Sequence, residues 1–158
     1  MSAEAVFALL DRELWLVTAA AGGRRGGLIA TFVSQASLPA GLPRVLVGLA
    51  RQHHTWGLVE ASKAFALHLL TEEHLDWVWR FGLRSGRDGD KLDGLAVRAG
   101  TSGSPLLTDA PGWLDCRVEA RLETGEVLRS EGAPTGHKLA GHVMQRAAQP
   151  LEPEAVAA

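Results

Sequence analysis

The sequence predicts a mainly β protein, a closed or nearly closed antiparallel barrel with helices at its periphery. Six segments have strand-like composition, and they outnumber the segments that look helical. They are not spaced as alternating strand–helix–strand units, which argues against a doubly wound parallel sheet. The length of 158 residues suits one domain, which we place at 1–150 with a disordered tail at 151–158. The predicted strands cover residues 14–20, 28–37, 44–50, 64–70, 113–122 and 137–146.

Apolar spacing and glycines define the elements of the N-terminal half. Residues 3–12 predict a short amphipathic helix, with Val6 and Leu9 among the apolar residues on one side. The paired glycines at 22–27 predict a turn, because glycine reaches positive φ without steric cost. The strand at 44–50 has apolar or small residues on both faces, so we expect it to be buried.

Capping residues predict two further helices. Thr55 is the expected N-cap of a helix over 56–61. Thr71 is expected to cap the next helix, on which Leu75 and Trp79 lie on the inner face with Val78. Both helices would lie outside the barrel.

The C-terminal half combines a long excursion with a regular strand. Residues 82–111 hold six glycines and two prolines, yet leucines punctuate them, which predicts an ordered excursion rather than a linker. Residues 113–122 alternate between apolar and polar side chains, which predicts a strand with one buried face. Cys116 lies on the apolar face as a buried small hydrophobe, and Asp115 lies on the polar face.

Charge and cysteine content exclude several classes of partner. The formal net charge is -2 at pH 7, so we expect neither nucleic acid nor an anionic membrane as a partner. The densest basic spot, Gly-Arg-Arg-Gly at 23–26, holds only two arginines. The single cysteine, Cys116, excludes an internal disulfide and favours a cytoplasmic location. The six histidines lack familiar ligand spacing, so we expect no metal site.

The common nucleotide-binding and hydrolase motifs are absent, but residues 26–55 group side chains that suit a phosphorylated ring compound. These are Thr31, Ser34, Gln35 and Ser37 on one predicted strand and its exit, and Arg51, His53, His54 and Thr55 at a helix start. Hydroxyls, a cation and free N–H groups suit a phosphate, while Phe32, Trp56 or Phe81 could form an apolar wall for a flat ring. The residues alone leave open the alternative of ordinary strand hydroxyls and a solvated Arg51.

Short motifs in a fixed order connect the chain to a known family. They are LVTAA at 16–20, GGLIATFVSQASLPAGLP at 26–43, RVLVGLARQHHTWGLVEASKAFALHLL at 44–70, WRFG at 79–82, DKLDGL at 90–95, SPLLTDAPGWLDCRVEARL at 104–122 and GHKLAGHV at 136–143. This order resembles the flavin reductase-like, FMN-binding split-barrel family over nearly the whole chain. No single motif is highly specific, whereas the ordered set is. The resemblance implies an antiparallel Greek-key split β-barrel with peripheral α-helices.

The resemblance also implies an activity and a cofactor site. Family members typically are homodimers that reduce FMN, or FAD, with NADH or NADPH, often to supply a monooxygenase partner. The implied cofactor-binding residues are Ala30, Thr31, Phe32, Val33, Ser34, Gln35, Ser37, Arg51, His54, Thr55 and Phe81. Among them, Ser34, Gln35 and Ser37 would hold the ribityl chain and phosphate. Arg51, His54 and Thr55 would complete the phosphate site.

His137 matches the histidine of the family's G-D-H motif, which lies by the nicotinamide. It is implied to orient the nicotinamide, while the flavin does the chemistry. Two departures bear on this role: Gly136 replaces the aspartate, and the interval from His137 to Gly141 is one residue short. They leave open an FMN-binding electron carrier without efficient NAD(P)H turnover. A barrel that binds neither flavin nor nicotinamide is a third alternative.

Overall fold

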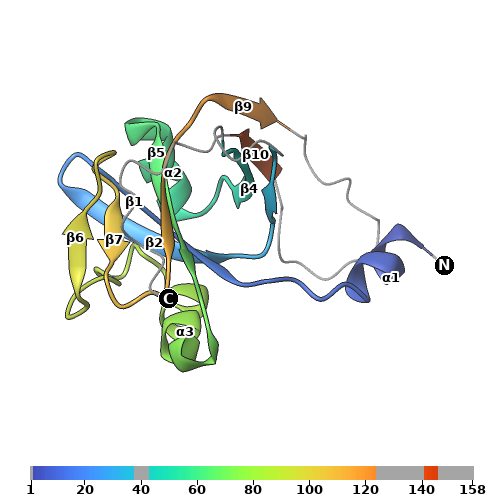
Figure 1. Cartoon of the computed structure of the whole chain (residues 1–158), viewed down its shortest axis with the longest axis horizontal. Coiled ribbons are helices and arrows are strands. Elements are labelled where there is room, and N and C mark those ends of the chain that lie inside the picture. The colour runs from blue at the N-terminus through green and yellow to red at the C-terminus, as the bar shows by residue number, and fades with distance from the viewer. Residues whose placement is uncertain (1, 38–42, 124–140, 146–158) are drawn as a thin grey trace.

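The computed structural model describes residues 2–37, 43–123 and 141–145, which form mainly antiparallel β structure with few helices (Figure 1). The strands are β1 (Trp15–Ala21), β2 (Arg24–Ala30), β3 (Val33–Gln35), β4 (Val45–Ala50), β5 (Ala64–Leu69), β6 (Val97–Ala99), β7 (Pro105–Leu107), β8 (Trp113–Arg117), β9 (Ala120–Glu123) and β10 (Gly141–Gln145). The helices are α1 (Ala3–Ala8), α2 (His54–Ser62) and α3 (Leu75–Leu83), with the 3-10 turn η1 (Glu72–His74) directly before α3. The prediction of a mainly β protein is confirmed.

Two four-stranded antiparallel sheets form the body of the molecule. The first has the strand order β2-β1-β5-β8, and the second has the order β3-β4-β10-β9. The chain passes from the first sheet to the second at residues 31–32, between β2 and β3, and again at 118–119, between β8 and β9. The two sheets therefore share two nearly continuous runs of chain, each bent at a corner.

The predicted strand at 28–37 is wrong as one element, because it is broken at Phe32. A Cβ atom added at Gly48 would lie 2.9 Å from the Cβ of Phe32, so β4 approaches the corner closely and needs a glycine there. The Gly48 amide also donates to the Phe32 carbonyl at 2.8 Å. The turn before β2 is shorter than predicted and contains only Gly22 and Gly23, with φ of 57° and 75°.

The predicted strand at 113–122 is also wrong as one element, since β8 and β9 lie in different sheets. The Val118 amide donates to the carbonyl of Lys63, which ends α2 in the left-handed conformation. The alternation of buried side chains stops at this point, and Leu122 is exposed instead of buried. Local alternation carries no information about such a corner.

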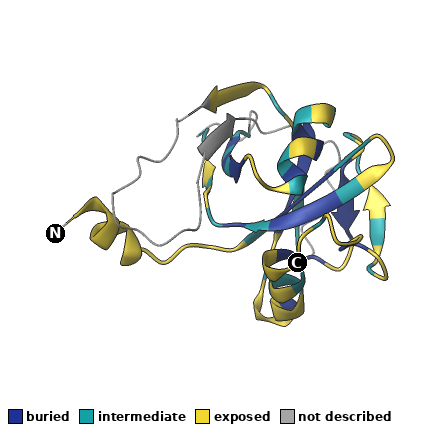
Figure 2. Ribbon diagram, turned by 180° about the vertical axis from the view of Figure 1, so that it is seen from behind, coloured by how far each residue is buried: buried dark blue, intermediate teal, exposed yellow. Residues whose placement is uncertain are grey.

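Both faces of the first sheet are buried, as Figure 2 shows for its central strands. One face packs against the second sheet and α2 through the cluster Val17, Ala19, Leu28, Ala30, Val45, Val47, Leu49, Leu58, Val59, Phe65, Leu67 and Cys116. The other face packs through Leu16, Phe81, Leu92 and Leu107. Because side chains alternate along β1, Leu16 and Val17 belong to different clusters. The predicted burial of Cys116 is confirmed, whereas the strand predicted at 44–50 is buried on one face only, since Leu46 and Gly48 on its other face are half-buried.

The first two helices differ from the prediction in their bounds. The helix predicted over 3–12 covers only α1, which buries none of its residues. The predicted cap at Thr55 is wrong: His53 is the N-cap of α2, and Thr55 lies buried in the first turn. The side chain of Thr55 lies beside Gly26 of β2, where a Cβ would be 3.6 Å from its hydroxyl oxygen.

The third helix has the predicted cap but not the predicted face. Thr71 caps η1 with a reciprocal pair of contacts to His74, which confirms it as the start of the helical segment. Leu75 and Trp79 are 57% and 62% exposed, whereas Phe81 is buried. The segment begins with a 3-10 turn, which rotates each residue further around the axis than an α-helix does and so changes the buried face.

The predicted ordered excursion at 82–111 is confirmed and carries the β6–β7 hairpin. Two buried polar side chains fix β7 against the first sheet. Thr18 Oγ1 donates to the Pro105 carbonyl at 2.5 Å, and the Leu107 amide donates to His68 Nε2 at 3.0 Å. The hairpin covers the core cluster of Leu16, Phe81, Leu92 and Leu107.

Asp115 is buried rather than on a solvent-exposed polar face, because the loop before β7 covers it. Its carboxylate accepts hydrogen bonds from the Ser102 amide at 2.9 Å and from the Ser102 hydroxyl. We expect Asp115→Ala to lower the free energy of unfolding by about 2–3 kcal/mol, since it removes two hydrogen bonds to a buried carboxylate and leaves the half-buried Ser102 amide without that partner. Urea unfolding measures this, with the exposed neighbour substitution Arg117→Ala as the control. Equal effects of the two substitutions would contradict the role of Asp115.

The C-terminal strand β10 pairs with β4 and β9 and so completes the second sheet. It lies within the strand predicted at 137–146. His137 and the tail at 151–158 lie outside the described residues. No helix among the described residues is long and apolar enough to cross a membrane.

Candidate functional site

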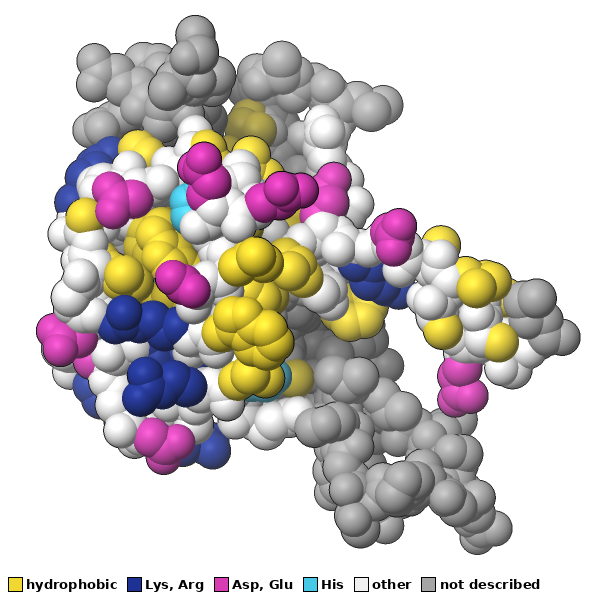
Figure 3. Space-filling model, turned by 90° about the horizontal axis from the view of Figure 1, so that it is seen from below, with side chains coloured by type: hydrophobic (Ala, Val, Ile, Leu, Met, Phe, Trp, Pro, Cys, Tyr) yellow, Lys and Arg dark blue, Asp and Glu magenta, His cyan; other side chains and the backbone are white. Residues whose placement is uncertain are grey.

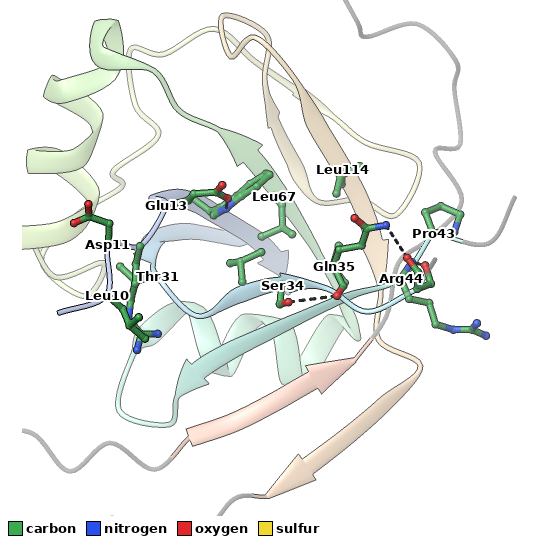
Figure 4. A pocket seen from close by; sticks show the side chains of 15 residues that line it. Leu10, Asp11, Glu13, Thr31, Ser34, Gln35, Pro43, Arg44, Leu67 and Leu114 are labelled. Carbon is green, nitrogen blue, oxygen red and sulfur yellow. Dashed lines mark hydrogen bonds between the residues drawn. The ribbon is translucent and has the colours of Figure 1, made fainter. Parts of the chain in front are cut away.

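A cavity of about 780 Å³ lies where the segment before β1 passes β3 (Figure 4). Its volume is in the range of roughly 300–1,000 Å³ that is usual for small-molecule sites. The lining residues come from the N-terminal segment, both sheets and the start of β4: Leu10, Asp11, Arg12, Glu13, Trp15, Thr31, Val33, Ser34, Gln35, Ser37, Pro43, Arg44, Val45, Leu67 and Leu114. We call it the large cavity.

The large cavity brings together five of the residues predicted from the sequence, namely Thr31, Val33, Ser34, Gln35 and Ser37. The Ser34 hydroxyl donates to the Gln35 carbonyl at 3.3 Å, and Gln35 Nε2 donates to the Ser37 carbonyl at 2.6 Å. The Ser37 hydroxyl accepts from the Arg44 amide at 2.7 Å, so its own proton stays available to a ligand. Opposite these polar groups, Leu67 and Leu114 supply an apolar wall from the other sheet (Figure 4).

The sequence analysis missed two cations at this cavity, Arg44 and Arg12. Arg44 makes two hydrogen bonds to the carboxylate of Glu119, from Nε at 2.8 Å and from Nη2 at 3.3 Å. These bonds, together with the carboxylate's charge, raise the pKa of Arg44 above its usual value. The guanidinium of Arg12 lies 4.5 Å from the ring centre of Phe32. No local sequence signal predicts these contacts, because their partners come from distant segments.

Ala30 and Phe32 are placed differently from their neighbours. Ala30 is buried in the core, so only its backbone is available to a ligand. Phe32 is half exposed at the corner between the sheets and does not line the large cavity. Among the described residues, no group of three or more His, Cys, Asp or Glu side chains could hold a metal ion.

The remaining predicted residues lie elsewhere. His54, Thr55 and Phe81 line a separate cavity of about 250 Å³ at the start of α2, and Arg51 lies in the turn before this helix. Ser37 contacts residue 44 at one end of β4, whereas Arg51 follows the other end. The six residues of β4 separate them by about 20 Å at roughly 3.3 Å per residue, so one phosphate cannot contact both.

The His54 ring is held between two glycines. A Cβ atom at Gly86 would lie 3.0 Å from His54 Cδ2, and one at Gly26 would lie 3.2 Å from it, so larger residues would displace the ring. Burial lowers the pKa of His54, and the charges of Arg24, Arg87 and Lys91 lower it further. His54 is therefore surrounded by positive charge.

Comparison with known proteins identifies the family. Residues 7–145 match the model of the flavin reductase like domain. The chain belongs to the flavin reductase-like family. One relative of the chain is the ferric-chelate reductase (NAD(P)H) of Archaeoglobus fulgidus. The two are 31% identical over 121 residues, which cover 75% of this chain and 70% of that one.

Other relatives are much longer than this flavin reductase-like chain. A diflavin flavoprotein of Synechocystis is 29% identical over 137 residues, which cover 78% of this chain and 24% of that protein. The chain thus spans about a quarter of that relative. A high molecular weight rubredoxin of Moorella thermoacetica is 31% identical over 118 residues, which cover 51% of its length.

Solved structures share the fold at low sequence identity. The flavoredoxin of Methanosarcina acetivorans superimposes with a TM-score of 0.70 at 20% identity, covering 86% of this chain and 65% of that one. An NADH:FAD oxidoreductase of Streptomyces globisporus gives a TM-score of 0.72 at 20% identity, covering 90% and 75%. These similarities show that the chain has the same fold as the two solved structures.

Proposed function

We propose that the protein is a flavin reductase that uses NADH or NADPH to reduce FMN, with FAD as a second flavin. The observation that carries the proposal is the large cavity, with hydroxyl and amide groups along β3 facing an apolar wall, in a member of the flavin reductase-like family. The names of the Archaeoglobus and Streptomyces relatives support the same class of reaction.

The large cavity fits a flavin ring in size and chemistry. Val33, Leu67 and Leu114 would contact the flat faces, while Thr31, Ser34 and Ser37 would contact polar edges and the ribityl hydroxyls. The phosphate would lie at the start of α2, with Arg51, His54 and Thr55. There the amide groups of the first turn and the helix dipole favour an anion. The length of β4 between Ser37 and Arg51 suits an elongated ligand with a ring at one end and a charge at the other.

The protein's part in the reaction is to position the reactants. A bound flavin would accept the hydride of the nicotinamide. Thr31 lies at the corner between the sheets, where strand pairing stops and a polar group is available to a ring edge. His137 would hold the nicotinamide at the angle and distance needed for transfer.

The proposal extends to assembly and location. The two sheets, which are connected by short runs of chain at two corners, would form a Greek-key split barrel. Two copies would form a homodimer in the cytoplasm. A monooxygenase component would be the protein that consumes the reduced flavin.

A second function, an FMN-binding electron carrier without efficient NAD(P)H turnover, is favoured by two observations. Gly136 stands where the family motif has aspartate, so the histidine at 137 lacks that neighbour. Some relatives carry a matching segment within a longer protein, such as the diflavin flavoprotein and the high molecular weight rubredoxin. A carrier would keep the flavin bound and receive electrons from another protein.

Absorbance spectra distinguish these functions. We expect FMN to bind the purified protein. The visible absorbance bands of the bound flavin should then bleach on addition of NADH or NADPH. Bleaching by dithionite but not by either nucleotide would favour the carrier. Absence of any spectral or thermal change on adding FMN would refute both functions.

His137→Ala is expected to slow reduction of bound FMN by about 10- to 100-fold, because misplacing the nicotinamide by even a small distance reduces the rate strongly. FMN affinity is expected to stay near that of the unmodified protein. Stopped-flow absorbance measures the rate, and fluorescence titration measures the affinity. An unchanged rate would remove His137 from the mechanism.

A further inference from the structure

Helix α3 carries a second, exposed apolar face. Its inner face packs on the first sheet through Phe81, which is buried, and Trp77, which is half-buried. On the outer face, Leu75, Trp79 and Leu83 are 57%, 62% and 73% exposed. They follow one another at intervals of four residues, so they form one continuous stripe along the helix. We call these three side chains the outer stripe.

The outer stripe exceeds what α3 needs for its place in the fold. A surface helix normally has one apolar stripe toward the core and polar residues on the opposite side. Among the nine residues of α3, only Asp76 and Arg80 are charged, and the others are apolar or glycine. Large apolar side chains exposed together in one patch mark interaction sites in soluble proteins. The stripe therefore indicates a docking surface.

Charged residues border this surface in an ordered way. Figure 3, which views the molecule from the side of α3, shows apolar side chains gathered at the centre of the face with carboxylates and basic side chains around them. Along the helical segment, Glu72, Glu73 and Asp76 lie at the N-terminal end, and Arg80 and Arg84 lie at the C-terminal end. Among the described residues, Glu72, Asp76 and Arg84 have no ion-pair partner. Their charges are available to a partner.

The outer stripe and its charges are complementary to a second copy of themselves in one direction only. A twofold axis at Trp79 would place Leu75 against Leu83 of the partner subunit and Trp79 against its own counterpart. It would also bring the acidic end of each helix to the basic end of the other. A parallel arrangement would bring like charges together, which is unfavourable.

We propose that a second copy of the chain docks on the outer stripe, with the two α3 helices antiparallel across a twofold axis near Trp79. Tryptophan and leucine at the centre with charges at the rim are typical of protein interfaces. The outer stripe does not line the large cavity, so the pairing is separate from the proposed flavin site. Two nine-residue helices form less contact than the roughly 1,200–2,000 Å² of stable interfaces, so we expect the association to depend on concentration.

Trp79→Glu tests the pairing by mass. Sedimentation of the full chain over a range of concentrations should show the associated species reduced to half its mass in this variant, because two carboxylates would meet at the twofold axis. Phe7→Glu, which replaces an aromatic side chain that is 58% exposed on α1, is the matched control and should keep the unmodified mass. Circular dichroism should show that both variants are folded, since both side chains are exposed. An unchanged mass of Trp79→Glu, or an equal effect of the two substitutions, would overturn the proposal.

Cysteine cross-linking tests the direction of the helices. The single cysteine of the chain, Cys116, is buried, so an introduced cysteine reports on its own position. Trp79→Cys should give a disulfide-linked dimer under mild oxidation, because the two side chains meet at the axis. Leu75→Cys should not, because antiparallel pairing offsets residue 75 from its counterpart by about 12 Å at roughly 1.5 Å per residue. Leu75→Cys combined with Leu83→Cys should cross-link again.

No cross-link in Trp79→Cys, or an equally efficient one in Leu75→Cys, would overturn the antiparallel pairing. A dimer that became a monomer in Trp79→Glu would assign this surface to the homodimer named under the proposed function, and a tetramer that became a dimer would make it a second interface. Neither experiment uses flavin or nicotinamide. Failure of FMN to bind would therefore leave the pairing standing, which separates this proposal from the proposed function.

Discussion

Arg51→Ala is expected to weaken FMN binding by about 10- to 100-fold, because a hydrogen bond to a charged group contributes about 1.5–3 kcal/mol. Riboflavin lacks the phosphate, so its affinity should stay nearly unchanged. The prediction follows from placing the phosphate at the start of α2, directly after the turn that contains Arg51. Quenching of flavin fluorescence during titration measures both affinities.

Ser37→Ala is the matched control for this experiment. Ser37 lies at the opposite end of β4, in the large cavity, where we place the ring and the ribityl chain. Its loss should weaken FMN and riboflavin by the same factor. If Arg51→Ala reduced both affinities equally, or if Ser37→Ala affected FMN alone, the orientation proposed for the flavin would be wrong.

His68→Leu should lower the free energy of unfolding at pH 7 by about 2–3 kcal/mol, because it leaves buried backbone groups without partners. His68 is fully buried between β1 and β7. Since a carbonyl can only accept, Nδ1 donates to Leu16 at 3.1 Å, and Nε2 accepts from the Leu107 amide at 3.0 Å. The histidine therefore must be neutral in the folded protein.

The same residue should make the protein sensitive to acid. Burial lowers the pKa of His68 to about 4, against an unfolded value of 6.5. Between these values the unfolded chain binds more protons than the folded one, so stability falls as pH decreases. The loss from pH 7 to pH 4 should reach about 3 kcal/mol from this residue.

Urea unfolding at several pH values tests the acid sensitivity. His68→Leu should flatten the dependence between pH 6.5 and 4. His54→Gln removes a histidine whose pKa is also lowered, but which is only partly buried, and should flatten it less. An identical pH dependence in His68→Leu and the unmodified protein would contradict the assignment.

Several strands were predictable because the signal for them lies in their own residues. Runs of apolar residues predict β1, β4 and β5, and Thr71 predicts the start of the helical segment that follows it. The corners at 31–32 and 118–119 were not predictable, since they depend on Gly48 of β4 and on the carbonyl of Lys63. Both partners are distant in sequence, and a strand's alternation does not register them.

The candidate site was predictable only along single segments. The hydroxyl and amide residues from Thr31 to Ser37 share one cavity because they follow one another on the chain. The sequence analysis placed Ser37 and Arg51 in one phosphate site, whereas they lie at opposite ends of β4. Their separation follows from the register between β3 and β4, which the sequence does not give. The two arginines at 24 and 25 are the densest basic spot in the sequence, and only the fold places Arg87 at the same cavity with them.

The two corners also determine how the protein can open. A sheet cannot peel away from its neighbour while the β2–β3 and β8–β9 runs remain intact, because each run is hydrogen-bonded on both sides of its corner. The amide protons of both sheets should therefore exchange with solvent through one shared event, as a single cooperative unit. A molecule held at Thr31 touches one of these corners, so its affinity would protect both sheets together.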